Sequence, residues 1–106
     1  MTNKIIVLST SSNMEEAEKI ARRLVEDHLA ACVNVVPGMR SFYRWKGKVE
    51  DAAEWLLIIK SSRENFGALE AALGKLHSYE VPEVVAIPVV EGSKNYLNWM
   101  EKELGA

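Results

Sequence analysis

Apolar residues along the chain fall into four strand-like runs separated by helix-like stripes. The runs at residues 5–8 and 55–59 contain no polar position, which indicates strands covered on both faces. The runs at 31–36 and 83–90 are also strand-like, and Pro88 in the last one lacks an amide hydrogen and therefore favours a sheet edge. We expect runs 5–8 and 55–59 at the centre of one sheet and the other two at its edges.

Three stretches instead repeat apolar residues at spacings of three and four, which predicts amphipathic helices. The first helix is expected to run for about four turns towards His28, the second to end at His77, and the third to be short and terminal. Capping boxes predict starts at Ser12 and Ser61, and Asn95 is placed to cap the third helix. The apolar positions are Ala17, Ile20, Ala21, Leu24 and Val25, then Phe66, Leu69, Leu73 and Leu76, then Tyr96, Leu97, Met100 and Leu104.

The segment 31–60 is expected to form one long hairpin. Pro37-Gly38 signals a bend or bulge in its first strand, and Lys46-Gly47 is the expected reversal. Its outer part is too long to be covered by two helices, so exposed aromatic side chains would stand beside an open strand edge, a combination that marks protein interfaces. We therefore predict a homo-oligomer. The interface residues expected on the hairpin are Phe42, Tyr43 and Trp45.

The predicted order is β-α-β-β-α-β with an additional C-terminal helix, the α+β pattern of the ferredoxin-like fold. A length of 106 residues predicts a single domain, 1–106. No apolar segment is long enough for a membrane helix, and the start of the chain lacks a signal-peptide pattern, so we expect a cytoplasmic protein without a membrane partner. A net charge of −2, with basic residues scattered among carboxylates, argues against nucleic-acid binding.

Polar side chains that packing does not require form the candidate site. His77, at a helix end, is either a capping residue or a metal ligand. Cys32, the single cysteine, is either a buried structural thiol or a soft ligand for copper or zinc if His77 lies close by. Glu80 is either solvated or an oxygen ligand. Lys60 and Tyr79 are candidates for lining a ligand cleft, and no residues suggest a catalytic role.

Several short motifs are specific when taken as a set. They are Ala31-Cys32-Val33-Asn34, Pro37-Gly38, Ser41-Phe42-Tyr43-Arg44-Trp45, Gly47-Lys48, Lys60, His77, Tyr79-Glu80-Val81-Pro82-Glu83 and Tyr96-Leu97-Asn98-Trp99. Together they resemble the motifs of the CutA family, small proteins linked with tolerance of divalent cations. The resemblance implies a ferredoxin-like homotrimer in which long hairpins pair between subunits. It also implies a non-enzymatic role in the response to metal ions, with copper or another divalent cation as the expected ligand.

The chain departs from this family at positions described as copper ligands. Those ligands are a cysteine near the end of the first strand and two adjacent histidines before the tyrosine motif. The matching positions here are Ser9, Leu76 and His77. Only His77 keeps a side chain that binds copper, so the resemblance does not carry over the family's high-affinity copper site.

Other functions remain open at this point. A small-molecule or anion-sensing trimeric module would bind its effector in clefts between subunits, lined by Lys60, Tyr79 and Glu80. An acylphosphatase is disfavoured because the loop 9–13 has neither the glycines nor the arginine of a phosphate loop. RNA recognition is disfavoured because residues 54–58 replace the expected basic and aromatic strand with a mostly apolar one.

Overall fold

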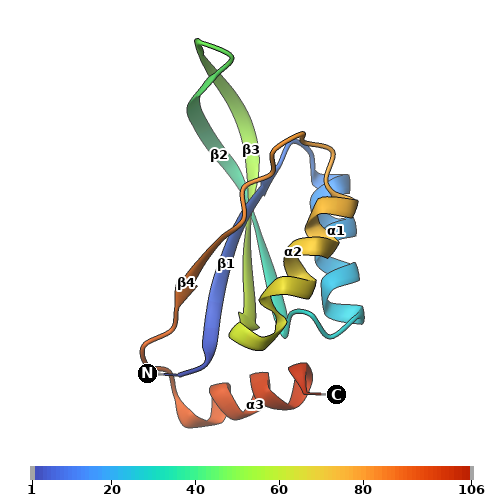
Figure 1. Cartoon of the computed structure of the whole chain (residues 1–106), viewed down its shortest axis with the longest axis vertical. Coiled ribbons are helices and arrows are strands. Elements are labelled where there is room, and N and C mark those ends of the chain that lie inside the picture. The colour runs from blue at the N-terminus through green and yellow to red at the C-terminus, as the bar shows by residue number, and fades with distance from the viewer. Residues whose placement is uncertain (1, 106) are drawn as a thin grey trace.

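The computed structural model describes residues 2–105 and has the predicted α+β architecture (Figure 1). Its four antiparallel strands lie in the order β2-β3-β1-β4, so the first and third strands are central, as predicted. Pro88 lies on the edge strand β4, which is shorter than the run 83–90 suggested. The elements are β1 (Lys4–Ser11), α1 (Met14–Glu26), β2 (Cys32–Trp45), β3 (Lys48–Ser62), the 3₁₀ turn η1 (Arg63–Asn65), α2 (Phe66–Leu76), β4 (Val85–Pro88) and α3 (Lys94–Leu104).

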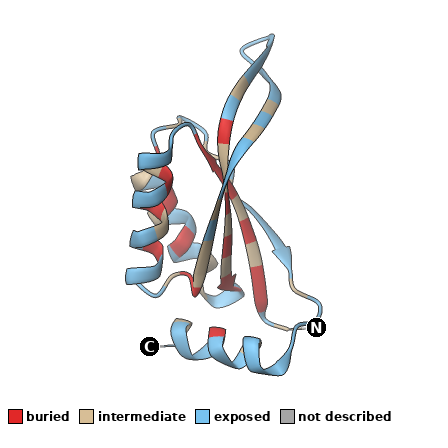
Figure 2. Ribbon diagram, turned by 180° about the vertical axis from the view of Figure 1, so that it is seen from behind, coloured by how far each residue is buried: buried red, intermediate tan, exposed pale blue. Residues whose placement is uncertain are grey.

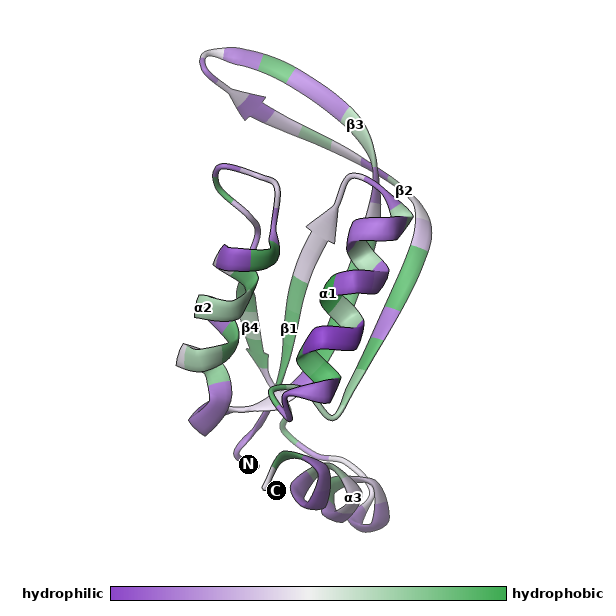
Figure 3. Ribbon diagram, turned by 90° about the vertical axis from the view of Figure 1, so that its right-hand side faces the viewer, coloured by the Kyte–Doolittle hydropathy of each residue, from purple (hydrophilic) through white to green (hydrophobic). Residues whose placement is uncertain are grey.

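Two helices cover one face of the sheet. Helices α1 and α2 lie side by side against it (Figure 3), while α3 crosses the end of the sheet that is farthest from the hairpin tip (Figure 1). The buried Lys4 of β1 forms an ion pair with Glu101, which fastens α3 to the central strand. The sheet face turned away from α1 and α2 is hereafter called the open face. Within residues 2–105, no helix is long and apolar enough to cross a membrane.

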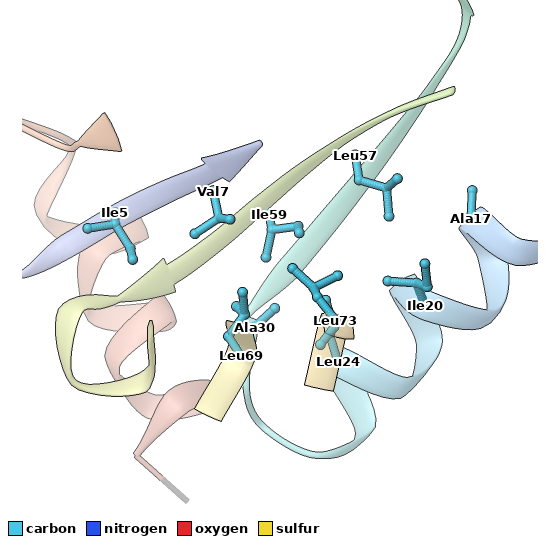
Figure 4. Packing of buried hydrophobic residues seen from close by; sticks show 10 residues of the cluster. All are labelled: Ile5, Val7, Ala17, Ile20, Leu24, Ala30, Leu57, Ile59, Leu69 and Leu73. Carbon is cyan, nitrogen blue, oxygen red and sulfur yellow. The ribbon is translucent and has the colours of Figure 1, made fainter. Parts of the chain in front are cut away.

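The core lies between the sheet and these two helices. Val7, Leu57 and Ile59 of the central strands point towards Ile20 and Leu24 of α1, and towards the leucines of α2 (Figure 4). All five side chains named here are fully buried. Each contributes about 1.5–3 kcal/mol through removal of apolar surface from water. The stripe predicted for α1 is therefore confirmed at these positions, whereas Val25, expected on it, is exposed.

The β2–β3 hairpin extends beyond the body of the protein, and its outer part is mostly exposed (Figure 2). It gives the molecule its elongated dimensions of 44 × 25 × 24 Å. Lys46 and Gly47 both have positive φ, the conformation that a two-residue hairpin turn requires. Pro37 and Gly38 together lie opposite the single residue Trp55, so the predicted irregularity is a β-bulge.

The helix starts differ from the predicted caps. Asn13, and not Ser12, caps α1 by accepting a hydrogen bond from the backbone N–H of Glu16 at 2.8 Å. Ser93, and not Asn95, caps α3. Ser61 is still within β3, where its hydroxyl donates a hydrogen bond of 2.6 Å to the Leu29 carbonyl in the α1–β2 loop. The serine predictions failed because β1 and β3 continue farther than the apolar runs indicated, so Ser61 belongs to β3 and Ser12 directly follows β1, one residue before the cap of α1.

Candidate functional site

His77 ends helix α2 and is buried inside the protein. Its backbone N–H closes the helix on the Leu73 carbonyl, and its side chain has no exposed surface. The Nε2 atom lies 2.5 Å from the carbonyl oxygen of Thr10, in β1. The Nδ1 atom lies 3.1 Å from the backbone nitrogen of Tyr79. Both ring nitrogens therefore have partners within the chain.

These contacts assign the proton on the ring. An N–H group can only donate, so Nδ1 accepts from Tyr79, and Nε2 carries the proton that is donated to Thr10. The Glu16 carboxylate lies 3.6 Å from Nδ1, but that nitrogen is already occupied, and Glu16 itself accepts a hydrogen bond from Ser11. His77 thus has no free nitrogen for a metal ion, and the geometry favours the capping interpretation.

Cys32 lies at the start of β2, directly opposite Lys60 of β3, and both side chains are on the open face. The Sγ atom is 3.9 Å from Lys60 Nζ, which also forms a hydrogen bond with Asn34. Burial of Tyr96, followed by its proximity to Cys32, raises the pKa of that tyrosine. The thiol is partly exposed, not buried as its neighbours in the sequence suggested.

The structure does not bring Cys32 and His77 together within the chain. Lys60 pairs with Ile6 of β1, whereas His77 contacts Thr10, four residues farther along the same strand. Four residues of strand span about 13 Å. Among residues 2–105, no group of three His, Cys, Asp or Glu side chains is close enough to hold a metal ion.

A cleft of about 770 Å³ lies between the hairpin and the loop 78–83. Tyr79 lines it and donates a hydrogen bond of 2.5 Å to Glu54 of β3. Burial and, after it, the Glu54 carboxylate raise the pKa of Tyr79. The hairpin contributes Ser41, Phe42, Tyr43, Trp45 and Glu54 to the lining, and β1 contributes Thr10.

Three residues were predicted to line a cleft between subunits. Tyr79 and Glu80 line the cleft found within the chain, whereas Lys60 lies near the other end of β3, beside Cys32. The predicted interface residues do lie on the exposed hairpin, where Phe42 is 72% exposed. Glu54 is the main cleft residue that the sequence reading missed. The sequence did contain an indication of this residue, because a carboxylate stands directly before the apolar run 55–59, on a strand expected to be buried.

A four-stranded antiparallel sheet with helices on one face and a long projecting hairpin defines a small ferredoxin-like protein with an open sheet face. The sequence matches the family described as CutA1 divalent ion tolerance protein over residues 5–103. The chain therefore belongs to the CutA1 family, which confirms the resemblance found in the motifs.

Individual relatives agree with this assignment. A protein from Thermus thermophilus named divalent-cation tolerance protein CutA is 46% identical over 100 residues, covering 94% of this chain and 97% of that protein. A chloroplastic CutA protein from Arabidopsis thaliana is 44% identical, covering 92% of this chain and 53% of that protein. The crystal structure of CutA from Xylella fastidiosa matches with a TM-score of 0.94 at 39% identity, covering 97% of this chain and 99% of that chain.

Proposed function

We propose that this protein is a cytoplasmic, non-enzymatic homotrimer that contributes to tolerance of divalent cations. The family match over residues 5–103 supports the tolerance role, since relatives of similar length carry that name. A free thiol at Cys32 fits a reducing compartment. Co-fractionation with a cytosolic marker enzyme tests the location, and recovery with an extracytoplasmic fraction would contradict it.

The exposed apolar surface of the single chain supports self-association, and the resemblance to the CutA family implies three copies. Phe42 and Val49 of the hairpin are 72% and 68% exposed, and Val85 and Ile87 expose apolar surface on the open face. Apolar groups gathered beside an unpaired strand edge indicate contact with another protein surface. Other copies of this chain would cover both the hairpin and the open face.

The mass in solution tests this assembly. Sedimentation equilibrium should give three times the chain mass of 11.9 kDa. Trp45→Ala removes a large aromatic side chain from the hairpin and should shift the mass towards smaller species at low protein concentration. Glu70→Gln, on the exposed surface of α2, serves as the matched control and should leave the mass unchanged. A fully trimeric and equally stable Trp45→Ala variant would argue against the hairpin as the contact.

Direct binding of copper or another divalent cation is the finer part of this proposal. His77 does not fit such a role because both of its nitrogens have partners within the chain. Cys32 lies on the face that we assign to contact with other copies, so symmetry could supplement it with further ligands. Calorimetric titration of the metal-free trimer with Cu(II) and Zn(II) should show binding that is lost in Cys32→Ser and retained in His77→Gln. Loss in His77→Gln alone would reverse this assignment.

The cleft favours a second candidate, a module that binds a small molecule. The sequence predicted that Lys60 would receive an anion in this cleft. Lys60 lies elsewhere and carboxylates line the cleft instead, so an anion is no longer the expected ligand. Stabilisation of the protein by a small molecule in metal-free buffer would support this function, whereas stabilisation by metal alone would support the first.

A further inference from the structure

Four side chains of β3 follow one another along the open face of the sheet, and we call them the β3 strip. They are Glu54, Leu56, Ile58 and Lys60. Positions two apart along a strand share a face, and the intervening Leu57 and Ile59 point into the core on the other side (Figure 4). The bulge of the hairpin lies in β2, so this alternation in β3 is unbroken. The β3 strip is therefore negative at one end, apolar in the middle and positive at the other.

Both charged ends of the strip lack a counter-charge within the chain. Glu54 is only 7% exposed, and its one hydrogen-bond donor among residues 2–105 is the Tyr79 hydroxyl. Lys60 is partly buried, and its ammonium group contacts Asn34 and Cys32 but no carboxylate. Neither Glu54 nor Lys60 forms an ion pair with another residue in the described part of the chain.

The two charges cannot neutralise each other in a single chain. Six residues of strand separate Glu54 from Lys60 and span about 20 Å, which is much longer than an ion pair. The open face is the surface that we assign to contact with other copies, so assembly would remove water from Lys60 as well as from Glu54. Charged groups that lose their hydration are normally paired, because an unpaired buried charge is costly. Each end of the strip therefore requires an opposite charge from another copy.

A cyclic trimer can supply both opposite charges. In a ring of identical copies, neighbours meet through two different surfaces, so a residue of one copy contacts a different residue of the next. We propose that Glu54 of each copy pairs with Lys60 of the neighbouring copy, which gives three such pairs in the trimer. The apolar middle of the strip, Leu56 and Ile58, would be covered by the same contact. The proposal rests on the trimer proposed above and names the residues that set how its copies are arranged.

The lysines at the hairpin tip are weaker candidates for the partner of Glu54. Lys46 and Lys48 are exposed, and the Lys46 Nζ atom lies 5.8 Å from the centroid of the Trp45 ring of its own chain. An exposed ammonium group stays hydrated and gains little from an ion pair. Lys48 nevertheless provides a matched control, because it lies six residues from Glu54 along β3, as Lys60 does, but in the opposite direction.

A double-mutant cycle on the assembly tests the pairing. Sedimentation equilibrium over a dilution series gives the dissociation constant of the trimer for the unmodified protein, Glu54→Gln, Lys60→Gln and the double variant, and circular dichroism checks that each is folded. Each single variant should weaken the trimer about tenfold or more, because it leaves the partner charge buried and alone. The double variant should be no weaker than the weaker single variant, since both charges are removed together.

Lys48→Gln is the control for this cycle. It should leave the trimer nearly unchanged, and its effect should add to that of Glu54→Gln without coupling. A second variant keeps the test available if Glu54→Gln folds poorly. Lys60→Glu changes only a partly exposed residue and would bring two carboxylates together, so it should dissociate the trimer into smaller species, whereas Lys48→Glu should not.

The outcomes separate this proposal from the trimer itself. A trimer in which the effects of Glu54→Gln and Lys60→Gln simply add, or in which Glu54 is coupled to Lys48 instead, would overturn the pairing and leave the trimer intact. A dimer that shows the expected coupling would support the pairing and overturn the trimer. A monomer at every concentration would overturn both.

Discussion

Replacing His77 tests whether its side chain is structural or binds metal. His77→Ala would leave the Thr10 carbonyl and the Tyr79 N–H without their partners, and Thr10 is buried. Each unsatisfied buried group costs about 1–3 kcal/mol. The Tyr79 backbone is less deeply placed, so we expect a total loss of about 2–4 kcal/mol. With a slope of about 4 kcal/mol per M, the guanidinium chloride midpoint should fall by about 0.5–1 M.

Two conservative variants separate the two hydrogen bonds. In His77→Gln, the side-chain amide nitrogen can take the place of Nε2 and donate to Thr10. In His77→Asn, the amide oxygen can take the place of Nδ1 and accept from Tyr79. Each variant should therefore recover part of the stability lost in His77→Ala. Unfolding is followed by circular dichroism at one fixed protein concentration, because the midpoint of an oligomer depends on concentration.

The reasoning would be refuted by an unchanged midpoint in His77→Ala. It would also be refuted if Zn(II) or Cu(II) raised the midpoint of the unmodified protein but not that of His77→Gln, since that pattern belongs to a metal ligand. The exposed His28 serves as the control, because its Nδ1 donates one hydrogen bond to the Glu103 carbonyl. His28→Ala should lower the midpoint by much less.

Three other predictions concern stability, each measured from chemical unfolding midpoints. Because burial and the Glu54 carboxylate raise the pKa of Tyr79 above its ordinary value of 10.0, the contribution of Tyr79 to stability should be fully present below pH 10 and be lost above it, so stability should fall less steeply in Tyr79→Phe; an equal fall would contradict this. Asn13→Ala should cost about 1 kcal/mol through loss of the α1 cap, whereas Ser12→Ala should cost little. Gly47 has a φ of +81°, so Gly47→Ala should destabilise the protein by about 1–2 kcal/mol. Gly74 lies on α2 with open space around it, so Gly74→Ala should stabilise the protein by up to about 1 kcal/mol. A stability change of the same sign in both variants would refute the backbone argument.

Most of the fold could be predicted from hydrophobic pattern alone. Residues 5–8 and 55–59 lie on central strands. One face of these strands packs on the helices, and the open face is the one that we assign to contact with other copies, which accounts for runs without polar positions. Pro88 is tolerated because β4 is an edge strand. Helix starts were less predictable. Ser12 has the residue type of a cap, but the position of a cap depends on where the preceding strand ends, and β1 runs on to Ser11 through partners in β3.

The site was less predictable than the fold because it depends on contacts between distant segments. The role of His77 is fixed by the Thr10 carbonyl, 67 residues away in the sequence, and a backbone carbonyl has no sequence signature. Lys60 and Tyr79 were placed in one cleft because both follow regular elements. They lie apart because the antiparallel hairpin carries Lys60 back to the end of the sheet where Cys32 begins β2.

The bulge at Pro37-Gly38 explains how one hairpin serves the core, the cleft and the open face. If the two strands were paired from the turn onwards without this extra residue, Val35 would lie opposite Ile58 and point to the open face. Cys32 would then point to the core. The bulge places two residues opposite Trp55, so Cys32 pairs with Lys60 and Val35 packs against the core. A one-residue change of register exchanges the two faces of a strand. The bulge therefore allows the outer hairpin to direct its aromatic residues towards the cleft while the inner half of the same strand completes the core.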